Sequence, residues 1–323
     1  MQPAGFRFFR RLHRPEAVFD SASGFVMSTV ALAWGAHPDF PLVLFANRDE
    51  SHTRPTAPAA WWTDEPGCLG GRDLAGGGTW FGVARDGRFS LVTAFRDSAP
   101  ADPDAPTRGQ LPLEYLSSGE EPVVHARRFV RARGGHPPFN LLIGSPRHMY
   151  YAATRARLPL ALTPGIHTLS NGLLDEPWPK CVRLDTLLGS YVRTHGGFAM
   201  LLGAYSELSK ADVRGADDPV CTAKPVTPAD FATAGFSMLA DRETTYEGLP
   251  DTGVGRAEEE RLSACFVIGA ESGTRSTTAL IMARDGRIYF EERSFDPAGV
   301  ESGRVVEEWT IDPQVFSGSG NDD

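Results

Sequence analysis

The chain has 323 residues, with 32 Lys and Arg against 41 Asp and Glu and a formal net charge of −9 at pH 7. This length can bury a large core in one extended domain or in two smaller ones. The acidic balance argues against a nucleic-acid partner or an anionic membrane surface, because both reward basic patches. No apolar run approaches the ~20 residues of a membrane span, so no membrane span is expected.

Cysteine and histidine spacing predicts neither a metal nor another cofactor. The four cysteines are far apart and form no C-x-x-C pair. The eight histidines are scattered, and none has the paired spacing of metal ligands. Zinc and disulfide chemistry are therefore not expected, and a reducing cytoplasm is the default location.

Residues 1–26 differ in character from the rest of the chain. They carry a basic, aromatic segment, but no apolar stretch follows its arginines as a secretion signal requires. Two interpretations remain, a disordered basic extension and an upstream start codon that is not used. We expect one main domain over 27–312, followed by a disordered tail at 313–323.

Strands come first along the chain, helices follow, and strands return. Apolar and β-branched runs between turn residues predict strands at 29–34, 42–47, 79–85 and 88–96. Apolar residues at helical spacing predict short helices at 109–117, 122–133, 180–194 and 197–208. Further strands are expected at 139–144, 150–154, 265–268, 277–283 and 287–293, and loops at 211–227 and 248–260. Asp86-Gly87 and Asp285-Gly286 are strong hairpin signals. The order indicates an α+β layered fold.

The strand expected at 42–47 ends in an unusual way, because Asn47, Arg48, Asp49 and Glu50 follow one another there. A buried strand that delivers such residues must meet ionic or hydrogen-bonding partners, since unpaired buried charge costs several kcal/mol. This feature points to a functional site. The alternative is a strand that simply runs out into solvated charge.

Other uncommon motifs stand in order around this tetrad. They are Met27-Ser28-Thr29, Arg54-Pro55-Thr56, Gly76-Gly77-Gly78-Thr79-Trp80, Leu169-Ser170-Asn171-Gly172, Pro177-Trp178-Pro179-Lys180 and Gly273-Thr274-Arg275. Over residues 27–295 the set resembles the NRDE family, the relatives of transport and Golgi organisation protein 2. Members of that family begin where Met27 stands, which favours Met27 as the working initiator.

The resemblance implies an N-terminal-nucleophile hydrolase-like fold, a four-layer αββα sandwich whose first strand carries the nucleophile. Family members usually have Cys directly after the initiator Met, whereas this chain has Ser28. Removal of Met27 would place an α-amine beside the Ser28 hydroxyl. Such an amine has a pKa near ~7.7 to 8.0 and can act as the base, which would allow cleavage of an amide or ester.

The same resemblance suggests catalytic roles for four more residues. Asp49 would contact the α-amine of Ser28, and Arg48 would lie beside the nucleophile. Because neighbours on a strand face opposite ways, which of these two points inward stays open. Asn171 would orient the amine or donate to the oxyanion, and Arg275 would hold the N-terminal strand or a substrate carboxylate.

Three further residues are candidates for ligand binding. Asn47 belongs to the charged tetrad, Trp80 either packs in the core or walls an apolar pocket, and Arg108 leads into a helix from which it could reach the site. Ser28 is one departure from the family pattern, and a second departure further weakens the hydrolase interpretation. Ala94 stands where the family typically has an Asn, and losing one oxyanion donor costs ~2.7 to 4 kcal/mol.

Two functions therefore stay open. The first is an amidohydrolase or acylase with Ser28 as nucleophile. The second is a non-catalytic carrier for a small-molecule or acyl-type ligand. For this second function the resemblance allows a hydrophobic ligand such as haem, in haem homeostasis, or an acyl-CoA or lipid.

Overall fold

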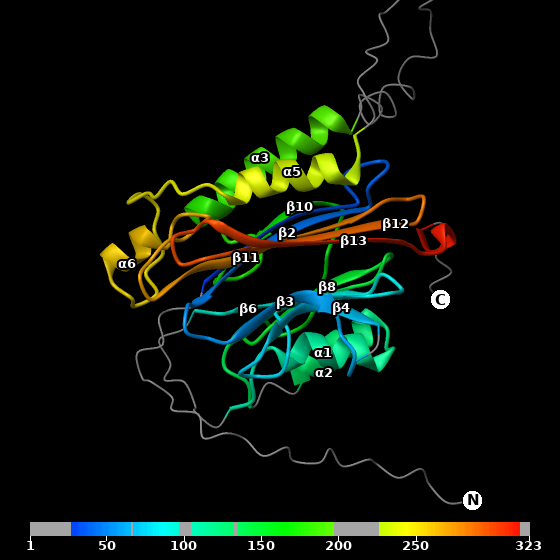
Figure 1. Cartoon of the computed structure of the whole chain (residues 1–323), viewed down its shortest axis with the longest axis horizontal. Coiled ribbons are helices and arrows are strands. Elements are labelled where there is room, and N and C mark those ends of the chain that lie inside the picture. Colours follow the sequence, from blue (N-terminus) through cyan, green and yellow to red (C-terminus); the bar gives the residue numbers. More distant parts are fainter. Residues whose placement is uncertain (1–26, 66, 97–104, 132–134, 197–225, 317–323) are drawn as a thin grey trace, which may run out of the picture.

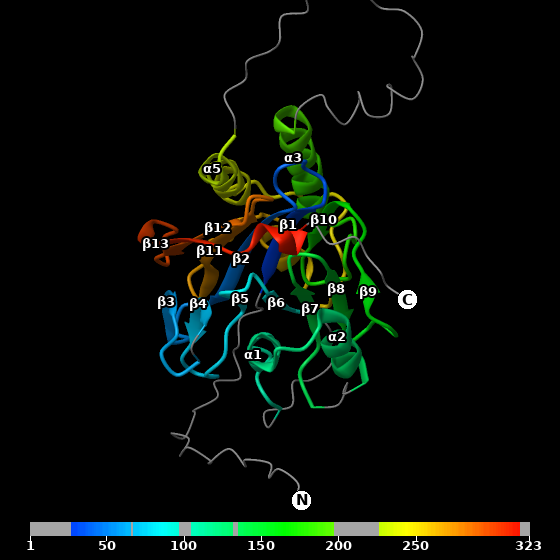
Figure 2. The same cartoon turned by 90° about the vertical axis from the view of Figure 1, so that its right-hand side faces the viewer.

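The protein is described here by a computed structural model, which covers residues 27–65, 67–96, 105–131, 135–196 and 226–316. Within these residues two antiparallel sheets lie face to face, and helices cover the outer face of each sheet (Figure 1). The view turned by 90° shows the same stacking (Figure 2). The chain is thus α+β, as its sequence predicts.

The first sheet has six strands in the order β10-β1-β2-β11-β12-β13. Their bounds are Gly165–Leu169, Ser28–Trp34, Leu42–Ser51, Ser272–Met282, Arg287–Phe295 and Glu301–Thr310. On its outer face lie α3 (Pro179–His195) and α5 (Pro228–Leu239) (Figure 1). Strands from the two ends of the chain meet here, because β1 and β2 pair next to β11.

The second sheet has seven strands, β3 to β9, in sequence order. Their bounds are Thr56–Trp61, Cys68–Asp73, Phe81–Ala84, Phe89–Ala94, Phe139–Gly144, Met149–Ala153 and Leu160–Ala161. Its outer face is covered by α1 (Gln110–Ser118) and α2 (Pro122–Arg131) (Figure 2). Most of these consecutive pairs have short connections, and α1 and α2 lie in the longer connection between β6 and β7.

Strand alternation distributes the apolar residues over three core layers. On β2, Leu42 and Leu44 belong to the core between the two sheets, whereas Val43 and Phe45 belong to the core under α3 and α5. A third apolar cluster joins the second sheet to α1 and α2. Because β2 is buried on both faces, polar residues near its end must find partners on both sides.

Several predicted elements are confirmed, and others are wrong. Both hairpins and the helix starting at the Pro-Trp-Pro-Lys motif are present. The strand expected at 265–268 is absent: the backbone nitrogen of Phe266 donates to the loop carbonyl of Asp241, and β11 bonds this segment through Thr274 and Val267 alone among the described residues, so no ladder forms. A helix, α6 (Arg256–Arg261), lies within the expected loop, and the expected disordered tail begins with a 3-10 turn, Pro313–Phe316.

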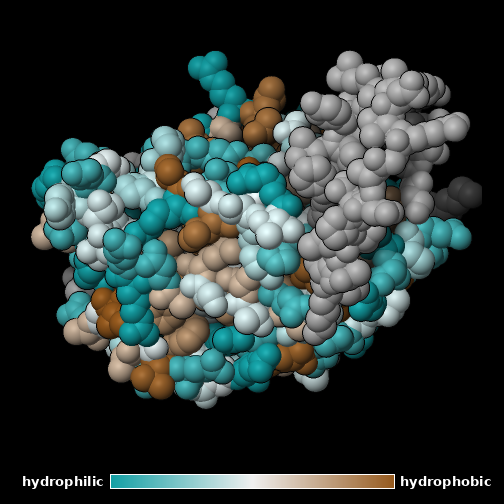
Figure 3. All heavy atoms as spheres, turned by 90° about the horizontal axis from the view of Figure 1, so that it is seen from above, coloured by the Kyte–Doolittle hydropathy of each residue, from teal (hydrophilic) through white to brown (hydrophobic). Residues whose placement is uncertain are grey.

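Some sequence predictions fall on residues that the structure does not describe. These are the N-terminal segment 1–26, the helix expected at 197–208, most of the loop expected at 211–227, and residues 317–323. Among the described helices, none is long and apolar enough to cross a membrane. On the face seen from above, apolar residues lie in patches among hydrophilic ones (Figure 3).

Candidate functional site

Ser28 is the first residue of β1, and the turn at residues 170–171 holds its main chain. The backbone nitrogen of Ser28 donates to Asn171 Oδ1 at 3.1 Å, and Ser170 Oγ donates to the carbonyl oxygen of Ser28 at 2.9 Å. The other end of the Asn171 amide donates to the carbonyl oxygen of Ala94 at 2.7 Å. Asn171 is fully buried. It therefore fixes the nitrogen of Ser28 relative to the end of β6.

The register of β1 and β2 decides which way Arg48 and Asp49 point. Ser28 lies directly opposite Arg48, so the two side chains share a face. That face continues into Leu44 and Ala46, which pack between the sheets. Arg48 is therefore the neighbour of the Ser28 side chain in the inter-sheet space, and Asp49 faces the helical side.

Arg48 is held on three sides. Its guanidinium stacks on the Trp80 ring at 4.0 Å, donates to Thr56 Oγ1 at 3.0 Å and lies 3.5 Å from the Glu50 carboxylate. Burial lowers the pKa of Arg48 to about 10, against the opposing charges of Glu50 and Asp73. The guanidinium stays charged at neutral pH, so this face beside Ser28 is positive.

A glycine makes room for the aromatic wall of this site. A Cβ on Gly71 would lie 2.1 Å from the Trp80 ring, a distance that no side chain tolerates. Trp80 can therefore pack closely against the β4 backbone at Gly71, and its ring stacks on the Arg48 guanidinium.

Arg54 and Arg275 lie near Arg48, and Arg108 lies near Arg54. We call the four residues Arg48, Arg54, Arg108 and Arg275 the arginine cluster. Arg275 donates to Thr56 Oγ1 at 3.2 Å, the same oxygen that Arg48 contacts. It also bonds the carbonyl oxygens of Ser51 and Arg54. The bulge in β11 between residues 274 and 276 falls at Arg275. The cluster thus ties β11 to the segment that leads into β3.

The arginine cluster carries more positive than negative charge. Arg54 forms a two-bond pair with Asp73, at 3.0 and 2.7 Å, and lies 3.6 Å from Glu50. Arg108 donates to the carbonyl oxygen of Pro138 at 2.8 Å. Burial lowers the pKa of Arg108, with Glu50 acting against the shift and Arg54 reinforcing it. Glu50 and Asp73 are the carboxylates that pair with the cluster among the described residues, which leaves a surplus of guanidinium charge.

Asp49 lies on the helical side of the sheet and is only 2% exposed. Its Oδ1 accepts from Thr274 Oγ1 at 2.5 Å, and its Oδ2 has no hydrogen-bond partner among the residues that the structure describes. Burial raises the pKa of Asp49 to about 6, although the nearby Lys180 charge opposes the shift. Lys180 is also buried and donates to the carbonyl oxygen of Leu262 at 3.1 Å. The predicted contact between Asp49 and the Ser28 amine stays a prediction.

Asn47 serves the fold on the helical side. Its Nδ2 donates to the carbonyl oxygens of Leu239 and Cys265, at 2.9 and 2.8 Å, and its Oδ1 accepts from Thr277 Oγ1 at 2.5 Å. Both amide N–H groups of Asn47 thus bond the fold, and its oxygen accepts one hydrogen bond. The ligand-binding role of Asn47 stays a prediction.

Sequence reasoning did not assign roles to Thr56, Arg54 or Lys180, although each belongs to a motif that it singled out. Thr56 is the shared acceptor of two arginines, and Lys180 is buried near the Asp49 carboxylate. The sequence feature that could have indicated a role for Lys180 is its position directly after Pro-Trp-Pro, at the start of a buried helix. The described residues contain no group of three or more His, Cys, Asp or Glu side chains that could hold a metal ion.

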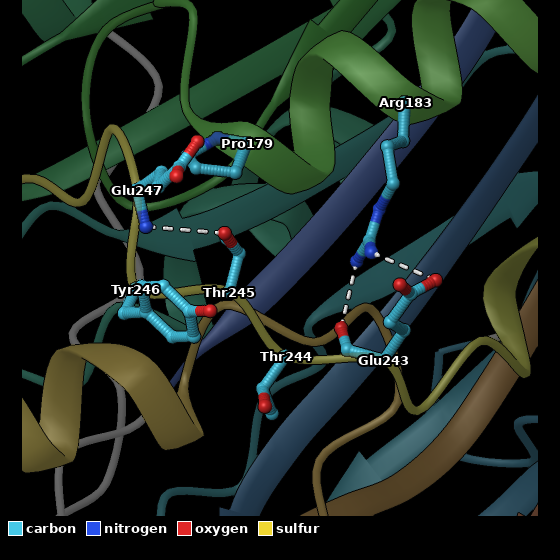
Figure 4. A pocket seen from close by; sticks show the side chains of 7 residues that line it. All are labelled: Pro179, Arg183, Glu243, Thr244, Thr245, Tyr246 and Glu247. Atoms are coloured by element: carbon cyan, nitrogen blue, oxygen red, sulfur yellow. Dashed lines mark hydrogen bonds and ion pairs between the residues drawn. The ribbon is translucent and has the colours of Figure 1, made fainter.

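One hollow among the described residues lies away from Ser28. It measures about 410 Å³, and its lining includes Pro179, Arg183, Glu243 and Tyr246 (Figure 4). Arg183 donates to the carbonyl oxygen of Glu243 at 2.9 Å, and the Glu243 side chain is mostly exposed. This hollow is open to solvent and contains none of the residues grouped around Ser28, so we do not take it as the candidate site.

The fold and site together define an α+β protein with two stacked antiparallel sheets and a buried serine at the start of an inner strand. The family model described as Transport and Golgi organisation 2 matches residues 27–297. The chain belongs to this family.

Two relatives and one solved structure show the extent of the similarity. The Transport and Golgi organization 2 homolog of Mus musculus is 26% identical over 271 residues, which cover 79% of this chain and 87% of the mouse protein. The homolog of Bos taurus is 27% identical over 273 residues, with the same coverage of 79% and 87%. A mutant of the conjugated bile acid hydrolase from Clostridium perfringens has a TM-score of 0.34 and 10% identity, over 89% of this chain and 97% of that chain.

Proposed function

We propose that this protein is an amide or ester hydrolase of the N-terminal-nucleophile type, with a four-layer αββα sandwich and a mature chain that begins at Ser28. One observation carries the proposal. The nitrogen of Ser28 donates to Asn171 Oδ1 at 3.1 Å. In a chain that starts at Ser28 this nitrogen is the α-amine, so Asn171 is the residue that orients the catalytic base.

The chemistry then needs only the first residue and water. The neutral α-amine takes the proton of the Ser28 hydroxyl as Oγ attacks the substrate carbonyl, and the leaving group departs with that proton. Water hydrolyses the resulting acyl-serine, with the amine again accepting a proton. An α-amine pKa near ~7.7 to 8.0 keeps a useful neutral fraction at physiological pH.

Ala94 limits the rate that we expect. Its carbonyl oxygen is bonded to Asn171, so it lies at the site, but its methyl side chain offers no donor to an oxyanion. Missing one such donor typically costs ~10² to 10³ in kcat. The proposed enzyme is therefore slow on generic substrates.

The arginine cluster favours a second candidate function, a carrier that binds without cleaving. Arg48 lies beside Ser28 in register and is part of a surplus of guanidinium charge. Guanidinium groups bind carboxylates and phosphates through paired hydrogen bonds. A carrier of an acyl compound, a lipid or haem would hold the anionic group of its ligand here, with Trp80 against the apolar part.

The cysteines support a cytoplasmic location for either function. Cys68, Cys181 and Cys265 are buried and unpaired. Burial raises the pKa of each of these thiols to about 11 or 12, so they stay protonated and unreactive. Proteins with free cysteines are typical of a reducing compartment such as the cytoplasm.

The test restores the two residues that differ from the family pattern. Ser28→Cys combined with Ala94→Asn should raise turnover of a panel of acyl p-nitroanilides and p-nitrophenyl esters by ~10² or more, because both changes act on the transition state. Ser28→Ala in the same protein is the matched control and should abolish turnover. All proteins start translation at Met27, and intact mass confirms that Met27 has been removed.

The same measurements separate the two candidates. A double variant with no gain over the wild type across the panel would rule against the hydrolase and favour the carrier. In that case Arg48→Gln should weaken binding of a long-chain fatty acid by at least ~10-fold, because it removes one partner from a buried charged pair.

A further inference from the structure

Met27 fills a buried space directly beyond the start of β1. It is 1% exposed and packs against Leu262 and Val267. Its carbonyl oxygen accepts from the backbone nitrogen of Asp49 at 3.0 Å, and Arg96 Nη2 donates to its sulfur. A charged guanidinium in a buried site thus faces a thioether, which is a weak acceptor.

The Arg96 guanidinium is satisfied on one edge only. Its Nη1 donates to Glu259 Oε2 at 2.6 Å and to Thr252 Oγ1 at 2.9 Å. Its Nε is buried and has no hydrogen-bond partner among the described residues. Nε and Nη2 lie on the same edge of a guanidinium, where their N–H groups form the fork that accepts a carboxylate. Within the part of the chain that the structure describes, this fork of Arg96 meets no oxygen, and the Met27 sulfur lies against its Nη2.

The space beside Arg96 is too small for a ligand while Met27 is in place. A cavity lined by Arg96, Trp178 and Lys180 measures about 10 Å³. That volume holds about one water molecule and no carboxylate. Arg96 and Leu262, which line this cavity, also contact Met27, so removal of Met27 would free the volume of its buried side chain beside them.

We propose that the space occupied by Met27 is a binding subsite for a carboxylate group of the ligand, opened when the chain begins at Ser28. The subsite rests on the proposed N-terminus. It offers the Nε and Nη2 fork of Arg96 and the backbone N–H of Asp49, which loses its acceptor together with Met27. Leu262 and Val267 form its apolar wall. The substrate class is thus an acyl compound that carries a carboxylate close to the bond that Ser28 attacks.

The charges around the space allow one added anion. Glu259 pairs with Arg96 through Nη1, at side-chain exposures of 5% for both residues. Asp49 and Lys180 are buried on the same side of β1 and carry opposite charges. Lys180 and Arg96 thus balance Asp49 and Glu259, and the Ser28 amine, which is neutral when it acts as the base, adds no negative charge, so one carboxylate can enter beside the Arg96 fork.

The experiment measures binding of a small carboxylate and of its neutral isostere. Propanoate and propanamide are titrated calorimetrically against two proteins: the full-length chain, which retains Met27, and a chain released with Ser28 as its first residue by cleavage of an N-terminal fusion. The second chain keeps every helix and strand of the described fold. Arg96→Gln with Glu259→Gln removes the charged pair together, and Arg157→Gln, at an exposed loop, is the matched control.

We expect propanoate to bind the Ser28-first chain at least ~10-fold more tightly than it binds the full-length chain. The Ser28-first chain should also bind propanoate at least ~10-fold more tightly than it binds propanamide. The Arg96 and Glu259 double variant should lose this preference, and Arg157→Gln should keep it. Equal binding by both chains, or equal binding of both probes, would overturn the subsite. If the double variant does not fold, the two wild-type chains decide alone. The result is independent of hydrolysis and of natural Met27 removal, because cleavage of the fusion sets the N-terminus.

Discussion

Glu292→Gln should make the protein more stable at pH 8 and leave its stability at pH 4.5 nearly unchanged. Glu292 lies on β12 and is 2% exposed. Its Oε1 accepts from the backbone nitrogen of Ala59 at 2.7 Å, and Thr278 Oγ1 donates to its Oε2 at 3.4 Å. A glutamine can keep the first of these bonds with its carbonyl oxygen. The substitution therefore removes a carboxyl group that titrates and keeps the hydrogen bond from Ala59.

The magnitude follows from the raised pKa. Burial raises the pKa of Glu292 from 4.5 to about 7, although the Ala59 bond and the Arg48 charge oppose the shift. The folded state then binds a proton that the unfolded state releases between pH 4.5 and pH 7, so stability falls as pH rises through that window. At about 1.4 kcal/mol per pKa unit, the carboxyl costs the native state about 3 kcal/mol above pH 7. Glu292→Gln should recover most of that at pH 8.

Urea denaturation of wild type and variant at pH 4.5, 6 and 8 measures the difference directly, since other titrating groups cancel between the two proteins. Glu291→Gln is the control with the opposite sign. Burial alone would raise the pKa of Glu291, but hydrogen bonds from Arg304, Tyr289 and Arg293 bring it below its usual value. That variant should lose stability at pH 8. A Glu292→Gln protein less stable than wild type at pH 8 would refute the reasoning.

Three other substitutions have defined outcomes. Asn47→Ala should lower the free energy of unfolding by about 2 to 4 kcal/mol in urea denaturation, because the buried carbonyl oxygens of Leu239 and Cys265 would lose their donor. Gly71→Ala should cost about 1 to 3 kcal/mol and change the tryptophan emission, since its Cβ would displace Trp80; unchanged emission would contradict the packing. Asn171→Ala should reduce kcat of the Ser28-first enzyme by ~10² with little change in KM, and an equal loss of binding would argue for a purely structural role.

The sequence predicts most inner strands, because they are short apolar runs between turn residues. It does not predict β4, whose two consecutive glycines resemble a loop, or β13, an edge strand of mostly exposed residues. The helix α5 was missed although Thr227 and Asp230 form its capping box, a pattern readable from the chain. In the run at 265–268, Cys265, Phe266 and Val267 are apolar and buried, but burial alone does not make a strand.

The candidate site was predicted in part. Alternation along β2 requires Arg48 and Asp49 to point apart, but only the pairing of Ser28 with Arg48 shows which of them lies beside the Ser28 side chain. The link between Ser28 and Asn171 spans 143 positions, and no local pattern contains it. Thr56 could not be assigned for the same reason, because its two arginines come from distant strands.

The central claim is that Ser28 acts as an N-terminal nucleophile, and one measurement tests it most directly. Intact mass spectrometry of the protein purified from its natural host, without tags, reads the first residue. The account predicts the mass of a chain that begins at Ser28, because only then does an α-amine stand beside the hydroxyl and bond Asn171. A mass that includes Met27, or the chain from Met1, would contradict it.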